Sequence, residues 1–150
     1  RSGSIDPGLI LFLEKKGYNL DKILNNESGL KGLTGIKDFR EILKHLKDKK
    51  VKLAYEIFIY KIIECIGAYI AILDGLNNLV FTGTIGKYSF KLRKDICEHL
   101  DFIDLKLDKI KKQKNSKIIS SKSSKIKVYV RDTEEDTIMV KEVLKIIWKF

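Results

Sequence analysis

The longest apolar segment of the sequence, residues 51–73, constrains the fold more than any other feature. Apolar side chains recur along it at helical spacing, and its second half, residues 65–73, carries no charged residue. This pattern predicts one long helix. The uncharged run is only about half of the roughly 20 apolar residues that a helix needs to cross a bilayer. We therefore interpret the segment as a buried core helix and not as a membrane span.

The composition places the chain among ordinary globular proteins. Its 150 residues suit one domain, residues 1–150, and 44% hydrophobic residues suffice for a packed core, which excludes disorder of the whole chain. One proline and 10 glycines exclude collagen-like and proline-rich classes. Cys65 and Cys97 match no metal-ligand or redox spacing. A disulfide scaffold is thereby excluded, one disulfide stays open, and a reducing compartment is favoured.

The positive charge of the chain raises the question of a nucleic-acid partner. Thirty basic residues against 20 acidic ones give a formal net charge of +10. Only four of the thirty are arginine, whose planar fork suits phosphates and base edges best. The 26 lysines are scattered over every segment, and isoleucine is over-used to the same degree, a composition that an AT-rich genome accounts for. We expect no specific nucleic-acid partner and, at most, weak and salt-sensitive binding.

The other segments alternate between helices and strands, which makes the fold class α/β. Asp6-Pro7 pairs an N-cap acceptor with proline at the first helical position, and Asp38 is a second N-cap candidate. Residues 28–35 hold three glycines and are expected to form a loop, and residues 109–125 are a loop region rich in lysine and serine. We expect helices over residues 7–16, 20–24, 38–46, 90–100 and 133–148, and strands over residues 79–82 and 126–130, with residues 118–119 as a further strand candidate.

A glycine turn over residues 83–86 follows the expected strand at 79–82 and precedes a helix. In this arrangement backbone N–H groups can meet a phosphate, although such a turn also serves simply to reverse the chain.

Two further groups of residues have both a structural and a chemical interpretation. Glu134, Glu135 and Asp136 stand at the expected start of the last helix. One interpretation is structural, because acidic side chains at this position complement the helix dipole. The alternative is a Mg²⁺ site. From the residues alone we favour the structural interpretation. His45 and His99 have no neighbouring ligand pattern, so we interpret both as surface or helix-end residues.

Six short motifs follow one another along nearly the whole chain. They are residues 1–8 (Arg-Ser-Gly-Ser-Ile-Asp-Pro-Gly), Ser28-Gly29-Leu30 with Gly32, Asp38-Phe39-Arg40, Ile66-Gly67-Ala68-Tyr69, residues 79–86 (Leu-Val-Phe-Thr-Gly-Thr-Ile-Gly) and Thr133-Glu134-Glu135-Asp136. In this order they resemble the Arg-Ser-Gly-x-Ile-Asp-Pro-Gly, Ser-Gly-Leu-x-Gly, Asp-(Met/Phe)-Arg, long-helix, Phe-Thr-x-Gly-Ile-Gly and Thr-Asn-Glu-Glu segments of acetate kinases. The chain therefore resembles most of the C-terminal domain of that family.

The resemblance implies a fold and an activity. The fold is a ribonuclease H-like domain of the sugar kinase/Hsp70/actin superfamily, with a mixed sheet flanked by helices. The activity is transfer of the γ-phosphoryl group of ATP to acetate, which gives acetyl phosphate and ADP, with Mg²⁺ as the metal. A homodimer is also implied, because the family's dimer contacts lie largely in this half.

The family's motifs assign roles to positions of this sequence. By resemblance, Arg1 stabilises the transferring phosphoryl group, a role that suits guanidinium geometry. Glu135 is the Mg²⁺ ligand, with Glu134 as the alternative register. The nucleotide positions are Asp38, Phe39 and Arg40 for the adenosine, and Thr84, Ile85, Gly86, Lys87 and Tyr88 for the phosphate loop.

Three residues of this loop depart from the family's Gly-Ile-Gly-Glu-Asn pattern. Thr84 replaces a glycine, and its β-branched side chain resists a positive φ. Lys87 inverts a charge in a way that can favour phosphate, and Tyr88 places a ring where a small amide is expected. These departures support an alternative function, a non-catalytic remnant that serves as an interaction or binding module.

The chain begins with Arg-Ser-Gly, without an initiator methionine or an apolar signal segment. We interpret it as a fragment or processed piece of a cytoplasmic protein. In the family the N-terminal domain supplies the acetate pocket, the catalytic aspartate and a second arginine. We therefore expect the fragment alone to be inactive.

Overall fold

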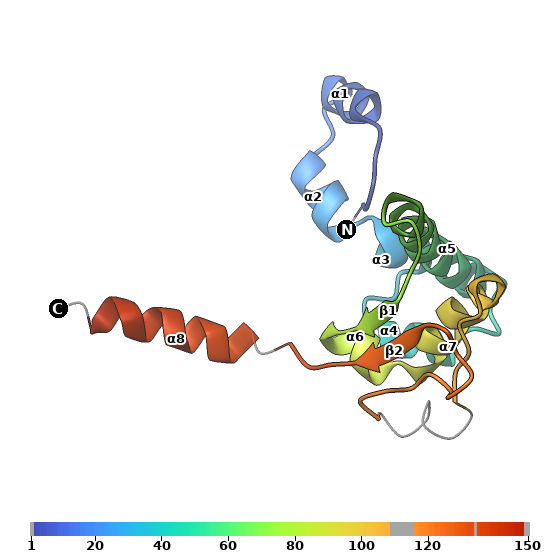
Figure 1. Ribbon diagram of the computed structural model, residues 1–150. Coiled ribbons are helices and arrows are strands. Elements are labelled where there is room, and N and C mark those ends of the chain that lie inside the picture. The colour runs from blue at the N-terminus through green and yellow to red at the C-terminus, as the bar shows by residue number, and fades with distance from the viewer. Residues whose placement is uncertain (1, 109–115, 134, 149–150) are drawn as a thin grey trace. The chain divides into compact units, whose positions relative to one another are not determined.

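A computed structural model describes residues 2–108, 116–133 and 135–148 (Figure 1). The chain divides into two compact units, Arg1–Cys65 and Ile66–Phe150, and the boundary falls inside the longest helix. In chain order the elements are α1 (Pro7–Lys15), α2 (Leu20–Asn26), α3 (Gly29–Thr34), α4 (Phe39–Lys44), α5 (Lys49–Ile72), β1 (Asn78–Phe81), α6 (Gly83–Tyr88), α7 (Phe90–Glu98), the 3₁₀ turn Asp101–Ile103, β2 (Lys127–Val130) and α8 (Glu135–Ile147).

The first two helices begin at side-chain caps. An Asp6 carboxylate oxygen accepts a hydrogen bond from the Leu9 N–H at 3.2 Å, and Pro7 stands at the first helical position, where no N–H is needed. Asn19 caps α2 in the same way through the Lys22 N–H at 2.9 Å. Both predicted helices are confirmed, and α2 extends two residues beyond its predicted end.

The prediction of a loop over residues 28–35 is wrong, because Gly29–Thr34 forms the short helix α3. A Cβ atom at Gly32 would lie only 2.3 Å from the carbonyl oxygen of Glu27. Glycine is therefore required here by the close approach of two backbone segments. The sequence shows the glycine but not the segment that it contacts.

The core of the first unit lies between α4 and α5. The Phe39 ring centroid is 5.5 Å from that of Phe58 and 6.1 Å from that of Tyr55, in tilted aromatic contacts. The helix predicted from Asp38 is confirmed, although α4 ends at Lys44 and not at residue 46. The buried apolar residues of this unit are Phe39, Ile42, Val51, Ala54, Tyr55 and Ile59.

The expectation that residues 65–73 are buried is wrong. The long helix itself is confirmed as α5, but its buried residues all lie in its first half. Tyr69, Ile72 and Leu73 are 60%, 74% and 67% exposed. Helical periodicity shows that a helix forms, whereas burial depends on which other element covers it. Among the described residues, no helix combines the length and the hydropathy that a membrane span requires.

The second unit contains the two named strands, which pair in parallel. The strands predicted at 79–82 and 126–130 are confirmed as β1 and β2. Strand β1 begins and ends one residue earlier than predicted, and β2 begins one residue later. An antiparallel bridge between Ile118 and Tyr129 adds a second kind of pairing at β2. The pairing is therefore mixed, as expected, and the candidate strand at 118–119 is present as this single bridge.

Helix α7 supplies much of the core of the second unit. Ser89 caps it by accepting a hydrogen bond from the Leu92 N–H at 3.3 Å. Burial raises the pKa of the Cys97 thiol to about 12, while Cys65 is exposed, and both thiols are free. His45 and His99 are the C-caps of α4 and α7 and are exposed, as predicted. The buried apolar residues of the unit are Phe81, Leu92, Ile96, Cys97, Leu100, Leu105, Ile119, Ile126, Val128 and Val130.

Candidate functional site

The carboxyl ends of β1 and β2 lie at one edge of the parallel pair (Figure 1). Phe81 is opposite Val130 in the register, and the Arg131 N–H donates to the Phe81 carbonyl oxygen at 2.9 Å. The segments that follow the two strands therefore start side by side. Ligands of open α/β sheets bind outside the carboxyl ends of the strands, so this edge is the candidate site of the second unit.

Helix α6 begins directly at this edge, so the prediction of a turn over residues 83–86 is wrong. Gly83 has φ +68°, which a residue with a side chain rarely adopts, and it redirects the chain from β1 into the helix. Thr84 lies inside α6 and has no positive φ. The β-branched substitution that the sequence marks as strained is therefore accommodated, because the positive φ falls one residue earlier.

Lys87 links α6 to the segment after β2. Its ammonium group forms an ion pair with the Asp132 carboxylate, and it also lies 4.8 Å from the centroid of the Tyr88 ring. Hydrogen bonds with Asp132 and then with Tyr88 raise the pKa of Lys87. Two of the three departures from the family pattern thus contact each other, and a carboxylate neutralises the inverted charge.

Arg93 of α7 is hydrogen-bonded to the backbone of α6. Its side chain is fully buried, and one guanidinium nitrogen donates to the Gly86 carbonyl oxygen at 2.9 Å and also to the Lys87 carbonyl oxygen. A buried cation needs partners for its donors, and here one guanidinium nitrogen serves two backbone carbonyls of α6. No motif in the sequence identifies this residue, because its partners are backbone atoms that α6 brings within reach.

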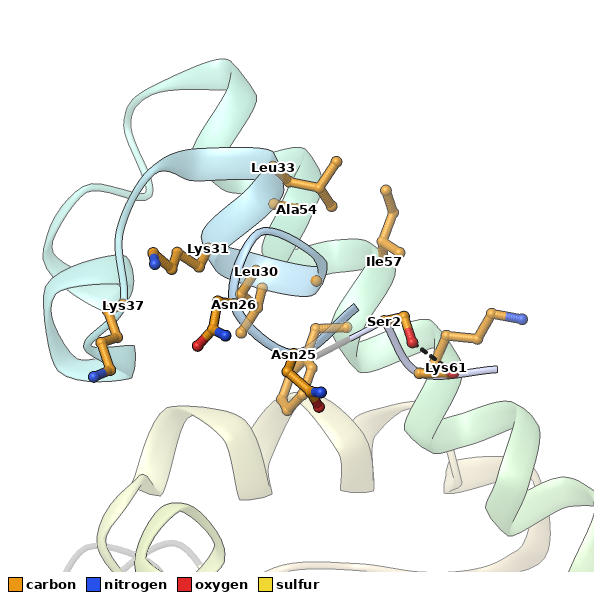
Figure 2. Close-up of a pocket in the computed structure, with 13 residues that line it drawn as sticks. Ser2, Asn25, Asn26, Leu30, Lys31, Leu33, Lys37, Ala54, Ile57 and Lys61 are labelled. Carbon is orange, nitrogen blue, oxygen red and sulfur yellow. Dashed lines mark hydrogen bonds between the residues drawn. The ribbon is translucent and has the colours of Figure 1, made fainter. Parts of the chain in front are cut away.

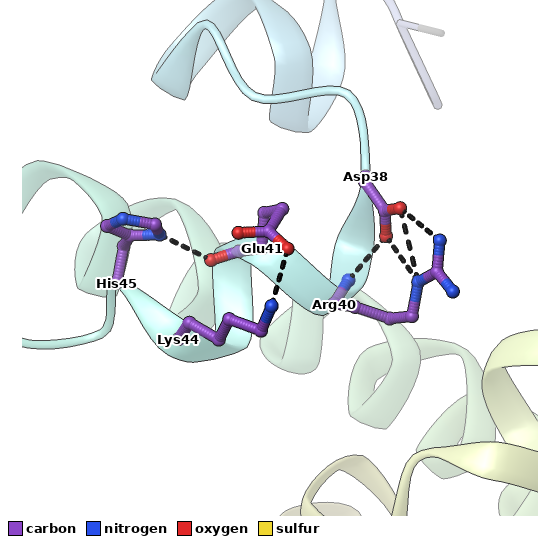
Figure 3. Close-up of polar contacts among 5 residues, drawn as sticks. All are labelled: Asp38, Arg40, Glu41, Lys44 and His45. Atoms are coloured by element: carbon purple, nitrogen blue, oxygen red, sulfur yellow. Dashed lines mark hydrogen bonds and ion pairs between the residues drawn. The ribbon is translucent and has the colours of Figure 1, made fainter.

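Asp38 and Arg40 form a compact pair in the first unit (Figure 3). The Asp38 carboxylate accepts from the Arg40 backbone N–H at 2.8 Å, which caps α4, and from the Arg40 side chain at 3.0 and 3.1 Å. The side-chain bond from Arg40, followed by its backbone bond, lowers the pKa of Asp38 to about 2. The pair therefore presents an exposed guanidinium beside a carboxylate that is ionised at neutral pH.

We expect the Arg40→Met variant to raise the pKa of Asp38 from about 2 towards its ordinary 3.8, because it removes the side-chain bond and leaves the backbone bond in place. A lowered folded-state pKa means that this carboxylate stabilises the folded state above pH of about 3.9, and that its contribution is lost as pH falls through about 2. Carboxyl carbon NMR shifts followed from pH 6 to pH 1.5 measure both values. An unchanged midpoint in the variant would contradict the assignment of the shift to Arg40.

Phe39 occupies a different position from its two neighbours. Its ring is buried against Tyr55 and Phe58, whereas Arg40 is exposed. The Phe39 side chain therefore belongs to the core of the first unit, and only its backbone lies beside the Asp38–Arg40 pair.

A pocket of about 590 Å³ in the first unit was not anticipated from the sequence (Figure 2). Ser2 and Gly3, which directly follow Arg1, line it together with residues of α2, α3 and α5. Two of the six motifs contribute to it: Ser2 and Gly3 belong to the motif at residues 1–8, and Gly29 and Leu30 belong to the Ser28-Gly29-Leu30 motif. Its described lining combines apolar, neutral polar and basic residues, without a carboxylate: Asn25, Asn26, Gly29, Leu30, Lys31, Leu33, Lys37, Ala54, Ile57, Phe58 and Lys61, besides Ser2 and Gly3.

The remaining predicted site residues fall at the margins of the described chain. Arg1 and Glu134 lie outside the described residues, and Glu135 is the first residue of α8, with its side chain outside the description. Within residues 2–108, 116–133 and 135–148, no cluster of three or more His, Cys, Asp or Glu side chains is placed to hold a metal ion. Asp38–Arg40 and Thr84–Tyr88 belong to different units, so their convergence on one nucleotide stays a prediction.

Comparisons with known proteins agree on one family. The model of the acetokinase family matches residues 1–141. Acetate kinase of Carboxydothermus hydrogenoformans is 39% identical over 155 residues, which cover 98% of this chain and 39% of that protein. A propionate kinase of Salmonella typhimurium is 36% identical over 153 residues, covering 97% of this chain and 38% of that protein.

Solved structures of the same kind match the fold. Acetate kinase of Porphyromonas gingivalis superposes with a TM-score of 0.81 at 31% identity, over 98% of this chain and 39% of that one. Acetate kinase of Entamoeba histolytica gives a TM-score of 0.82 at 28% identity, over 95% of this chain and 40% of that one. The chain thus spans about two fifths of the length of these relatives, and the expected fold is confirmed.

Proposed function

Because this chain belongs to the acetokinase family, we propose that it is the C-terminal, nucleotide-side domain, residues 1–150, of a kinase that transfers the γ-phosphoryl group of ATP to acetate. The products are acetyl phosphate and ADP. The match of the family model over residues 1–141 carries the proposal. Acetate is the proposed acceptor, as in the acetate kinase that is 39% identical to this chain.

Two segments are proposed to bind the nucleotide. Asp38 and Arg40 hold the adenosine from the exposed start of α4, and Phe39 contributes through its backbone because its ring is buried. Thr84, Ile85, Gly86, Lys87 and Tyr88 meet the phosphates. The position of α6 at the carboxyl edge of β1 and β2 supports this role.

Arg1 and Glu135 are proposed to act on the transferring group. Arg1 stabilises its charge through the bidentate geometry of guanidinium. Mg²⁺ on a nucleotide needs only one or two protein carboxylates besides the phosphates, and a carboxylate in the segment after β2 fits that requirement. Glu135, or Glu134 in the alternative register, would hold it, and the ion would supply neutralisation of phosphate charge.

The proposed partners are the substrates and a second copy of the same protein. The exposed apolar residues Tyr69, Ile72 and Leu73 at the end of α5 support a homodimer. We propose a cytoplasmic location and no specific nucleic-acid partner, since 26 scattered lysines supply only general phosphate attraction.

One observation favours the second candidate function, a non-catalytic remnant that serves as a binding module. Lys87, which stands where the family has glutamate, is already paired with Asp132. A loop whose cation is occupied in this way is a weaker phosphate site than one whose cation is open. Nucleotide affinity distinguishes the two functions, because a kinase domain has to bind ATP and a non-catalytic remnant does not.

The test is ATP binding by the whole 150-residue chain, measured calorimetrically at low salt. Arg40→Ala should weaken binding by about fivefold or more, because it removes an exposed donor and releases Asp38 from its pair. Lys44→Ala is the matched control: it also removes one cation from α4, which is paired with Glu41 at 2.7 Å, and should change affinity by less than about twofold. Equal losses in the two variants would show that only net charge attracts ATP.

A further inference from the structure

The Lys87–Asp132 ion pair joins two segments that are 45 residues apart in the sequence. Its position follows from the backbone, because Arg131 is hydrogen-bonded to the end of β1 and Asp132 comes next in the chain. Helix α6 begins at Gly83, just after the same end of β1, and this helix carries Lys87 to Asp132. The pair is therefore built by the parallel register of the two strands and not by chance proximity of loops.

The two partners are not equally accessible. The side chain of Lys87 is 25% exposed and lies along the Tyr88 ring, whereas that of Asp132 is 67% exposed. The ammonium group is thus held in place by its surroundings, and the carboxylate contacts it from the solvent side. An exposed carboxylate can leave such a pair without a burial cost, because water solvates it again at once.

We propose that Asp132 is an internal competitor for the nucleotide phosphates, which must displace its carboxylate from Lys87 in order to bind. The inference rests on the proposed function, in which residues Thr84–Tyr88 of α6 meet the phosphates. Phosphate is the stronger partner, because it carries more charge and more acceptor oxygens than a carboxylate. Binding then becomes an exchange of one anion for another on a single ammonium group: the Lys87–Asp132 ion pair opens, an ion pair with phosphate forms, and no covalent bond changes.

The exchange lowers the apparent affinity of the site. The phosphates bind only to molecules in which Lys87 is not paired with Asp132. The apparent dissociation constant is therefore the intrinsic one divided by the fraction of such molecules. The separated carboxylate also remains close to the phosphates and repels them. Exposed ion pairs of this kind are weak, so we expect the combined penalty to be about two- to tenfold in the dissociation constant.

The experiment measures binding of metal-free ADP and of adenosine to the whole chain by calorimetry, with EDTA present so that no metal ion contributes. Asp132→Asn should tighten ADP binding by about two- to tenfold and leave adenosine binding unchanged, because adenosine has no phosphate. Asp104→Asn is the matched control. Asp104 is also an exposed aspartate of the second unit in a long-range pair, with Lys125, and its variant changes the net charge equally. It should change ADP binding by less than about twofold.

Two further variants, Lys87→Met and Lys87→Met with Asp132→Asn, test whether the effect passes through Lys87. In a Lys87→Met background, Asp132→Asn should lose most of its gain. A full gain in that background would mean simple repulsion by Asp132 and would overturn the competition. If the wild-type chain binds ADP and Asp132→Asn does not exceed Asp104→Asn, the inference alone fails. If no variant binds ADP, the proposed nucleotide site fails and the inference fails with it. Asp132→Ser is the substitute should the asparagine variant fold poorly.

Discussion

The purified chain of 150 residues should form no acetyl phosphate from acetate, ATP and Mg²⁺ above a protein-free blank. Phosphoryl transfer depends on positioned charges around the transferring group, and the chain spans 39% of the length of an acetate kinase. By family resemblance, a facing domain supplies the acetate pocket, an aspartate and a second arginine. Loss of one such arginine lowers the rate by roughly 10³- to 10⁵-fold, and loss of the facing domain also admits water.

Hydroxamate formation from the acyl phosphate is the measurement, with a full-length acetate kinase as the positive control. Arg1→Ala in the 150-residue chain is the internal control. Turnover by the unaltered chain that disappears in this variant would show that the chain is self-sufficient, and the prediction would be wrong. Turnover that survives Arg1→Ala would point to a contaminating kinase in the preparation.

The second large effect should come from Arg93→Met. The substitution retains a long, flexible side chain but removes the donors that satisfy the carbonyl oxygens of Gly86 and Lys87. Hydrogen bonds from a charged donor contribute about 1.5–3 kcal/mol each, and partly buried acceptors left without a donor add a desolvation cost. We expect the free energy of unfolding to fall by about 2–4 kcal/mol, measured by urea denaturation.

Lys94→Met is the matched control for this measurement. Lys94 is the next residue of α7, is paired with Glu98 at 3.1 Å on the surface, and should contribute about 0.5 kcal/mol or less. Arg93→Lys should recover only part of the loss, because a single ammonium group cannot reproduce the planar fork. A change below about 1 kcal/mol for Arg93→Met would mean that water satisfies the two carbonyls as well as the guanidinium does.

Local signals in the sequence were reliable where a residue acts on its own neighbours. Asp6 and Asp38 were predicted to cap helices and do so, because the cap bond spans only two or three residues. The strands β1 and β2 were also predicted within one residue, because short apolar runs between turn residues indicate strands. Such signals hold in any fold that the chain adopts.

Glycine was the least reliable local signal. The sequence predicts a loop around Gly32 and a turn around Gly83, and both residues lie in short helices. Glycine in a helix costs only about 1 kcal/mol relative to alanine, so a packing requirement outweighs it. At Gly32 that requirement is the carbonyl of Glu27, and at Gly83 it is the change of direction after β1.

The sequence alone determined the two strands, the helices other than α3 and α6 and, through its six motifs, the family. Only the tertiary structure decided which of these residues meet. The parallel pairing of β1 with β2 brings Asp132 to Lys87, and the packing of α7 brings Arg93 to the carbonyls of α6. It also decided that the uncharged end of α5 is exposed. Contacts between residues far apart in the chain leave no periodic pattern in it, because loop closure and packing, and not local propensity, bring them together.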